Sequence, residues 1–460
     1  MPTYRPRMVA FLTVPVMGTD AERKRQARSE ETLQLTVHPS SVAIERNDHN
    51  EADALRMTCD WLDAGVDPRL LDDAIVQVHI DNADEFGRWR PTAANVRFIG
   101  IVNEVDVKRR LDDAAVVEIE ARDYTSLFLD AKPFHPAGVP SYSQSLEEAW
   151  RQIVRYTPDP EQPSAEVLAD NLVFQGVSPS VRLGDAVAER FRKLANVPTK
   201  PDTDAWAVWQ QCVGMLGLIS YIELDRCIVT TATNYYTERD APLFVWGRNL
   251  TEWGEGRVSR FAGVGVGITS FDPETGTTLE AVFGEPERRK RTRAKTISGS
   301  GAARHTANRR YFSVPGVSNQ EMLDRIARRV WEEMSRQELE GSCTTDEMRV
   351  QTENGAGFDV LSLKAGDSVV VQTDPQQRQI LGSLPTHAAR VRYLTELKGY
   401  NPDTAELIAR NIEDLAKLKS KFLTKRVRIE VSPADETFSV AIDYINRIQL
   451  TGATEARGGI

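Results

Sequence analysis

The stretch from Asn95 to Lys132 constrains the fold most, because it holds two runs of strict alternation separated by a polar turn. Phe98, Gly100 and Val102 occupy alternate positions in the first run, and apolar side chains also alternate over 116–121. A period of two is that of a β-strand, so we expect an antiparallel hairpin here. The segment RDYTSLFLDAK that follows has apolar residues at helical spacing, which predicts a short helix directly after the hairpin.

The length and composition describe a soluble protein of several domains. A chain of 460 residues exceeds what one core normally supports, so we expect two to four domains. Hydrophobic residues make up 41% of the chain and charged residues 27%, and no apolar run approaches the roughly 20 residues of a membrane span. The apolar run near the N-terminus contains Pro15 and is followed by charged residues, so we interpret it as a first strand and not as a signal peptide.

The charge balance and the cysteines exclude several classes of site. The net charge of −10 gives no general reason to expect a nucleic-acid partner. The four cysteines have no C-x-x-C spacing and the six histidines are equally scattered, so we expect reduced thiols, no zinc site and no cofactor.

Motifs of catalysis are equally absent from the sequence. The chain has no G-x-S-x-G, no H-E-x-x-H and no P-loop, so no residue is proposed as catalytic. The run G-V-G-V-G at 263–267 lacks the helix and the βαβ unit of a dinucleotide-binding loop, and we interpret it as a strand with one bare face.

The periodicity divides the chain into β-rich and helical parts. Strand patterns fill 32–80, and the region 133–242 reads as capped helices around a strand pair at 218–231. A second organising stretch at 243–284 combines a G-x-N-L motif with a predicted hairpin over 261–283. A helix is predicted over 318–339, and a charged helical segment at 385–424 precedes a closing hairpin.

The most unusual composition lies at 287–310, where nine Lys or Arg residues stand among glycine, serine and alanine. Because it lacks apolar periodicity, we expect a loop. Its first cations, Arg288, Arg289, Lys290 and Arg291, are candidates for an electrostatic contact. Aromatic residues that would stack on bases are missing from the loop, so an acidic protein surface within an assembly is favoured over nucleic acid.

Three of these stretches resemble one known family. The F-x-G-x-V strand, the R-D-Y-T-x-L motif, the G-x-N-L motif and the L-x-x-G-D-x-V strand pair look like the hub proteins of contractile phage tails, the late-control D group. They are also similar to the hub segment of type VI secretion VgrG spike proteins. The matching residues at which we expect a structural role are Phe98, Gly100, Val102, Asp123, Tyr124, Gly247, Asn249, Gly366 and Asp367. Asp367 is interpreted as a turn residue and not as a catalytic acid.

The resemblance implies a mixed α+β, β-rich fold with two tail-tube-like β-barrel domains, an α/β middle domain and helical insertions. The first barrel is expected at 1–132, the middle domain at 133–242 and the second barrel, with its basic loop, at 243–384. The remaining residues, 385–460, would supply the helical segment and a hairpin that completes the second barrel.

In that family two barrels in one chain allow three chains to form a ring of six similar units. The resemblance therefore implies a non-enzymatic baseplate hub in the virion tail, assembled in the host cytoplasm. Its expected partners are two further copies, a tail tube or tube-initiator protein and a separate central spike, since no spike segment is expected after residue 460; tape-measure and baseplate wedge proteins are further candidates. The two alternatives are a tail-associated peptidoglycan hydrolase and a particle protein that contacts nucleic acid.

Overall fold

The fold is described from a computed structural model of the chain. The structure describes residues 6–14, 33–60, 71, 73–83, 88–108, 115–130, 138–156, 168–186, 197, 203–236, 240–257, 264–272, 276–284, 309–314, 317, 320–336, 339–352, 354–372, 386–406, 409, 422–433 and 435–446.

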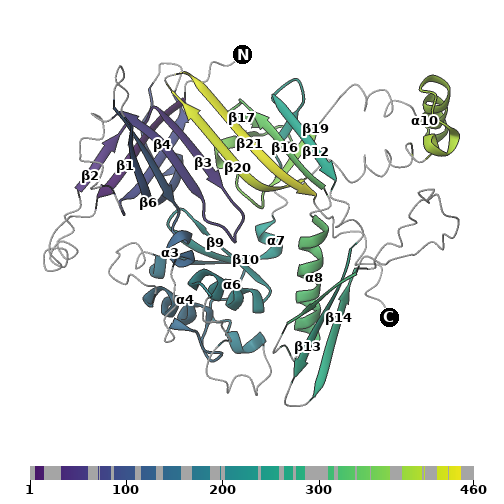
Figure 1. Ribbon diagram of the computed structural model, residues 1–460, viewed down its shortest axis with the longest axis horizontal. Helices are drawn as coiled ribbons and strands as arrows, with labels where there is room; N and C mark the ends of the chain where they lie inside the picture. The colour runs from purple at the N-terminus through teal and green to yellow at the C-terminus, as the bar shows by residue number, and fades with distance from the viewer. Residues whose placement is uncertain are drawn as a thin grey trace.

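A single large sheet forms the upper layer of the molecule (Figure 1). Its neighbouring strands follow the order β12-β16-β21-β20-β3-β4-β7-β6-β5-β1-β2, while β19 pairs with both β11 and β20. The strands are β1 (Pro6–Val14), β2 (Leu33–Val37), β3 (Ser41–Arg46), β4 (Ala54–Asp60), β5 (Ile75–Asn82), β6 (Val96–Lys108), β7 (Val116–Arg122), β11 (Leu243–Val245), β12 (Glu252–Arg257), β16 (Leu339–Thr345), β19 (Ser368–Gln372), β20 (Phe422–Ser432) and β21 (Thr437–Asn446).

The large sheet consists of two halves with the same strand connectivity. In the first half the neighbours run β1-β5-β6-β7-β4-β3, and in the second half they run β11-β19-β20-β21-β16-β12. Each of these six strands therefore has a counterpart at the same place in chain order in the other half, whereas β2, which pairs with β1, has none among the described strands. The two halves join where β20 pairs antiparallel with β3. The β1–β5 pair is antiparallel whereas β11–β19 is parallel, which is a difference between the halves.

One apolar core runs beneath both halves. In β4 the burial alternates, with Leu55, Met57 and Cys59 inside, and Ile429 and Ile442 of the second half are fully buried in the same cluster. β3 and β4 thus bury one face and leave the other to partly buried or exposed residues, as expected for an antiparallel sheet covered on one side, whereas β19 is buried at four consecutive residues. Burying such side chains contributes about 1.5–3 kcal/mol each, which makes this cluster the main stabilising element of the layer.

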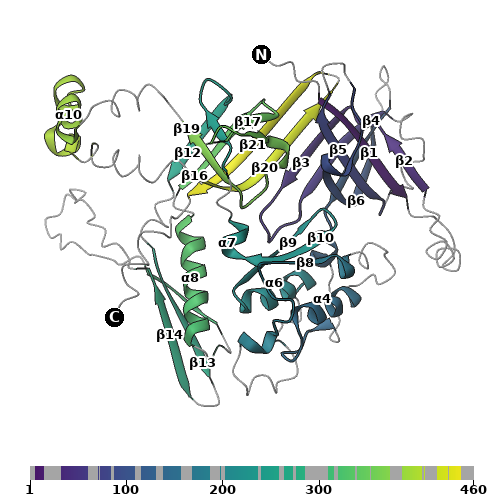
Figure 2. The same cartoon turned by 180° about the vertical axis from the view of Figure 1, so that it is seen from behind.

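A second, aromatic core lies below the first half (Figures 1 and 2). Ser145 caps one of its helices by accepting a hydrogen bond from the backbone N–H of Glu148 at 3.2 Å, and Asp204 caps another. The elements are α3 (Thr125–Leu129), α4 (Leu146–Arg155), β8 (Leu172–Gln175), η4 (Leu183–Ala186), α6 (Ala205–Met215), β9 (Leu218–Glu223), β10 (Arg226–Thr231) and α7 (Ala232–Tyr235). The β9–β10 hairpin is extended by β8, which pairs parallel to β10.

The third unit, below the second half, is a small sheet packed on one long helix (Figures 1 and 2). The sheet has the order β14-β13-β15, from β13 (Gly265–Asp272), β14 (Thr277–Phe283) and β15 (Arg309–Ser313), and the helix is α8 (Gln320–Arg336). Val266 and Ile268 are fully buried with residues of α8, whereas Tyr311 of β15 is 62% exposed.

Short elements complete the described chain. They are η2 (Ala93–Asn95), the strand pair of β17 (Arg349–Gln351) and β18 (Gly357–Asp359), η6 (Val360–Ser362), α10 (His387–Arg392), the π-helical turn η7 (Tyr393–Leu397) and a helical turn at 402–406. Helical structure between 386 and 406 agrees with the predicted charged helical segment, whereas most of 407–421 lies outside the described residues.

The β-rich mixed class is confirmed, and three expectations need adjustment. Among the described residues the large sheet does not close into a barrel. The predicted hairpin over 261–283 exists as β13–β14, but it belongs to the small sheet and not to the second half of the large one, because β15 and α8 cover it instead. The predicted helix 318–339 ends earlier, since Leu339 already begins β16. The domain borders at 132, 242 and 384 stay predictions.

Candidate functional site

The described residues contain no group of three or more His, Cys, Asp or Glu side chains placed to hold a metal ion. None of the helices in this part of the chain is long and apolar enough to cross a membrane. All four cysteines are buried, and burial raises the pKa of the Cys212, Cys227 and Cys343 thiols to about 12. Such thiols are poor nucleophiles, so the candidate sites are contacts and junctions.

A polar junction lies where the first half, the aromatic core and the 360–367 turn meet. It encloses a cavity of about 200 Å³. The guanidinium of Arg46, at the end of β3, donates to the backbone carbonyls of Leu361 and Leu363 at 2.8 and 2.7 Å, and to that of Arg97 at 2.9 Å. Arg97 in turn donates to the Asp359 carboxylate at 2.7 Å. Two arginines of the first half therefore fasten the second half by charge-assisted hydrogen bonds.

Two carboxylates in the junction are held in unusual environments. Burial raises the pKa of Asp53 to about 6, although Asn47 donates its backbone N–H to that carboxylate at 2.8 Å and Arg46 lies nearby. Burial, and then the charge of Asp53, raise the pKa of Asp123 well above its ordinary value. The charge of Asp53 therefore disfavours ionisation of Asp123.

Asp123 is the structural residue at the entrance to α3. Its carboxylate accepts hydrogen bonds from the backbone N–H and the hydroxyl of Thr125, at 3.0 and 3.1 Å. The neighbouring Tyr124 is buried in the aromatic core, and burial raises its pKa to about 12. The D-Y-T motif thus connects the hairpin of the large sheet to the layer below it.

The opposite wall of the junction comes from β9, α7 and the turn before β19. The ammonium of Lys364 donates to the Glu223 carboxylate at 2.7 Å and lies 5.0 Å from the ring centroid of Tyr221. The hydroxyl of Tyr235 donates to Asp48 at 3.0 Å, and burial raises the tyrosine pKa well above its ordinary value. This wall of the cavity therefore presents one ion pair and one hydrogen-bonded tyrosine–aspartate pair.

Two motif residues of the first half require close packing. Phe98 is 2% exposed in the core, and its ring packs against Gly100. A Cβ at Gly100 would lie 2.3 Å from the carbonyl oxygen of Arg122 and 2.7 Å from the Phe98 ring, so only glycine fits there. Val102 is buried just before a β-bulge that shifts the register of β6 against β7.

The motif residues of the second half close two turns. The buried Asn249 side chain accepts from the backbone N–H of Val245 at 2.6 Å and donates to the carbonyl of Leu243 at 3.0 Å, next to Gly247 at φ +74°. Gly366 has φ +88°, and Asp367 accepts from the backbone N–H of Lys364 at 3.0 Å. The junction and the motif turns adjoin one another, since a Cβ at Gly366 would lie 2.9 Å from the Tyr235 ring.

The solvent face of the large sheet carries ion pairs between neighbouring strands. At the join of the two halves Glu45 of β3 accepts from Arg428 at 2.7 Å and from Arg426 at 3.2 Å, and hydrogen bonds from both arginines lower the glutamate pKa against the raising effect of partial burial. Arg426 also donates to Asp443 of β21 at 2.9 Å. Each exposed pair contributes little energy, but together they favour one register of pairing.

Sequence reasoning did not single out Arg46, Arg97, Asp53 or the duplicated strand order. Arg46 ends an ordinary polar strand pattern, and two of its three carbonyl partners, Leu361 and Leu363, lie more than 300 residues away. One sequence signal could have revealed the duplicated strand order. Apolar residues alternate in a matching way over 101–108 and 423–430, which lie in counterpart strands. The four cations Arg288, Arg289, Lys290 and Arg291 lie outside the described residues, so their role stays a prediction.

Comparisons with known proteins show which kind of protein has a similar fold. No protein-family model matches this sequence, and a search of the curated proteins gives no significant match. Among solved structures the chain is similar to the tail protein from Neisseria meningitidis MC58, with a TM-score of 0.54 and 12% identity, over 96% of this chain and 97% of that one. It is equally similar to the 43 kDa tail protein of prophage MuSo2 from Shewanella oneidensis, with a TM-score of 0.54 and 11% identity, over 96% and 98%.

A third similar structure is the c3393 protein of E. coli, a component of the type VI secretion system. It has 9% identity, over 90% of this chain and 74% of that one, and a TM-score of 0.44, too low to establish a shared fold. The likeness to the two tail proteins, which covers 96% of this chain, shows that the chain has the β-rich fold of phage tail proteins.

Proposed function

We propose that this chain is the structural hub of a contractile-tail baseplate. Three copies form a ring with six similar units, which joins a sixfold tail tube on one side to a threefold central spike on the other. The chain acts by shape and contact, and we assign it no catalytic step.

The observation that carries this proposal is the duplicated strand order. Six strands of the first half have six counterparts in the second, in the same chain order and with the same neighbours. A chain that contains two similar units supplies six of them as a trimer, so a threefold particle presents a nearly sixfold surface. That is the geometry needed between a tube and a spike of different symmetry.

The fold likeness to two tail proteins supports the same proposal, since it extends over 96% of this chain. Accordingly we propose a location in the virion tail, and as partners two further copies, a tube or tube-initiator protein and a separate spike protein. Tape-measure and wedge proteins are further candidate neighbours.

Negative-stain electron microscopy with native mass spectrometry of the purified chain tests the proposal. We expect threefold rings with a central opening and a mass of three chains, formed alone or on addition of the spike protein. Compact monomers that persist at high concentration and with spike protein present would contradict the ring. Clearing of a peptidoglycan suspension, or salt-sensitive DNA binding, would instead favour the hydrolase or the nucleic-acid alternative.

A further inference from the structure

The join between β20 and β3 has no equivalent between their counterpart strands within the part of the chain that the structure describes. Beyond its bulge, β20 pairs on one edge with β21 and on the other with β3, from Val427 opposite Arg46 to Val431 opposite Val42. The counterpart of β20 is β6, and the counterpart of β3 is β12. In both views β12 lies at the outer end of the second half and β6 lies within the first half, so the two strands are far apart in one chain (Figures 1 and 2).

The bulges align β6 with β20 residue by residue. The register of β6 shifts between Val102 and Glu104, and that of β20 shifts between Thr424 and Arg426. The sequence IVNEVDVK at 101–108 therefore corresponds to LTKRVRIE at 423–430, with the same apolar alternation. Within the described chain, residues 104–108 of β6 pair with β7 alone, so the edge that β20 gives to β3 is open in β6.

The same alignment relates β12 to β3. Met57 of β4 and Cys343 of β16 are counterparts, since they pair with Ile119 and Ile442 at matching positions of β7 and β21. The residues opposite them are Val42 of β3 and Trp253 of β12. Among the described residues β12 pairs with β16 only, and it ends the sheet.

Exposed apolar side chains lie on both of these strands. Val107 is 46% exposed, whereas its counterpart Ile429, at the β20–β3 join, is fully buried. Trp253 is 41% exposed, whereas its counterpart Val42 is 2% exposed. Apolar residues are thus exposed on two strand edges that have no partner strand among the described residues, whereas the internal join buries its own, and this points to a contact with a second molecule.

We propose that residues 104–108 of β6 pair antiparallel with β12 of a second copy of this chain, in the register of the internal β20–β3 join. Asp106 then lies opposite the partner's Gly256, and Lys108 lies opposite the partner's Gly254. This inference rests on the proposed trimeric ring, and it identifies the strands that form the interface between neighbouring subunits. The same strand pairing then occurs once inside each chain and once between neighbouring chains. Three copies arranged head to tail therefore close into a ring with six nearly equal joins.

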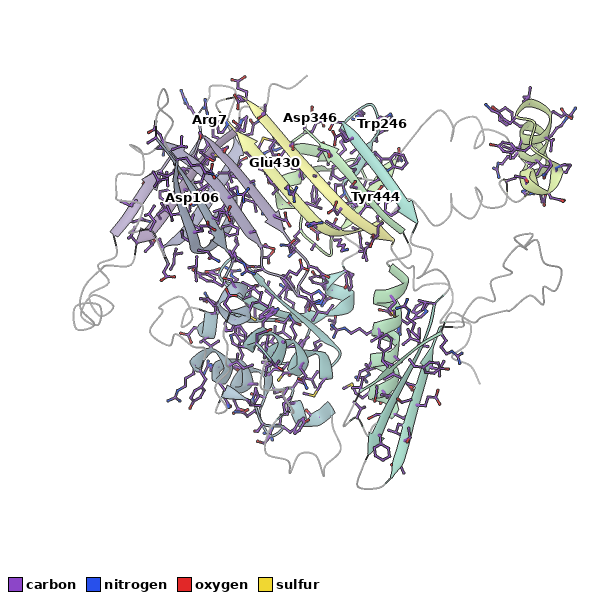
Figure 3. All side chains as sticks on the ribbon, in the orientation of Figure 1. Arg7, Asp106, Trp246, Asp346, Glu430 and Tyr444 are labelled. Carbon is purple, nitrogen blue, oxygen red and sulfur yellow. The ribbon has the colours of Figure 1, made fainter. Side chains whose placement is uncertain are left out.

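Charge disfavours one contact between two β6 edges. Glu104 and Asp106 are exposed on the β6 edge, and an antiparallel pair of identical edges centred on Val105 would place Glu104 of each copy opposite Asp106 of the other. On β12 the residue that would lie opposite Lys108 is Gly254. A Cβ at this position would make only an ordinary contact of 3.6 Å with Ser342. Asp106 and Trp246, labelled in Figure 3, lie in the first and second halves, with Glu430 of β20 between them.

Disulfide trapping in the full chain tests the register. Directly opposite residues of an antiparallel pair have Cβ atoms about 4.5–5.5 Å apart, close enough for a disulfide after small adjustment. We expect Lys108→Cys with Gly254→Cys to give covalent dimers and trimers, and nothing larger, on mild oxidation. A mixture of the two single variants should stop at dimers. The matched control is Val107→Cys with Gly254→Cys, whose two side chains would point to opposite faces of the joined sheet. We expect this pair to form at least tenfold less disulfide-linked product.

The possible results distinguish a failure of the proposed strand contact from a failure of the trimeric ring. Trimers by mass that do not cross-link at 108 and 254 would overturn the proposed contact and leave the ring in place. Absence of any oligomer, with spike protein present, would overturn both. As a second variant Val107→Lys changes an exposed residue, so the monomer should fold normally while the trimer weakens at least tenfold; an unchanged trimer would contradict the contact.

Discussion

At the residue scale, close approach makes Gly100 irreplaceable. Substitution by alanine would place a Cβ 2.3 Å from a backbone carbonyl oxygen, which cannot move without disturbing the β6–β7 pairing. We expect Gly100→Ala to lower the free energy of unfolding by at least about 2 kcal/mol. The control is Gly357→Ala, since its Cβ would meet no atom within 4 Å, and it should change the urea midpoint little. Equal effects of the two substitutions would refute the steric explanation.

The buried carboxylates predict how stability depends on pH. The pKa of Asp53 rises from about 3.9 in the unfolded chain to about 6 in the fold. The folded state therefore holds its proton more tightly, and the stability from this group is present below the lower pKa and lost as the pH rises toward 6. Asparagine cannot ionise, so the stability of Asp53→Asn relative to the natural chain should increase between pH 4 and 7, by about 2 kcal/mol.

Asp48 provides the opposite control for that titration. Burial raises its pKa, but hydrogen bonds from His49 and Tyr235 together lower it below the ordinary value. Its contribution is present above the unfolded pKa and lost as the pH falls, so Asp48→Asn should cost most at neutral pH and least in acid. Urea unfolding at several pH values should give two trends of opposite sign. Parallel trends would show that neither carboxylate governs the pH dependence.

At the element scale, the short helix α3 fastens the large sheet to the aromatic core. The ring of Phe128 is fully buried, 5.1 Å from Trp150 and 6.1 Å from Trp206 between centroids. We expect Phe128→Ala to cost about 3–5 kcal/mol in urea unfolding and to reduce the near-ultraviolet circular dichroism of the tryptophans. Leu129→Ala, at a half-buried neighbour, should cost clearly less, and a similar cost at both positions would argue against a specific aromatic core.

Local elements were predictable from sequence, and long-range pairing was not. The hairpin of β6 and β7, the caps at Ser145 and Asp204 and the αL turn at Gly217 follow from alternation and capping within a few residues. The parallel pairings of β8 with β10 and of β13 with β15 connect separate segments and leave no local pattern. This is why the 261–283 hairpin was found but placed in the wrong sheet.

The junction around Arg46 shows the same limit for sites. The Asp123 motif was noticed because its neighbours in sequence are also its neighbours in space. Arg46 binds carbonyl oxygens, and a carbonyl carries no side-chain signature in the sequence. Sequence therefore identified residues that shape turns, and the structure was required to find residues that join distant parts.

At the scale of the whole molecule, β20 and β6 hold the same position in the two halves. Among the described residues β20 pairs on both edges beyond its bulge, whereas β6 pairs there with β7 alone. Amide hydrogen exchange distinguishes them, because an amide that faces an open edge exchanges faster than one bonded to a neighbouring strand. In the isolated chain we expect residues 427–431 to be protected on both edges, and alternate amides of 104–108 to exchange rapidly.

Assembly should remove that difference. When rings form, protection should rise at 104–108 and at 252–257 together, because each strand gains the partner that its counterpart already has. The 427–431 segment, already paired inside the chain, is the internal reference and should not change. Protection that appears on β2 instead, at the other end of the first half, would mean that copies meet through a different edge and that the duplicated order does not set the ring.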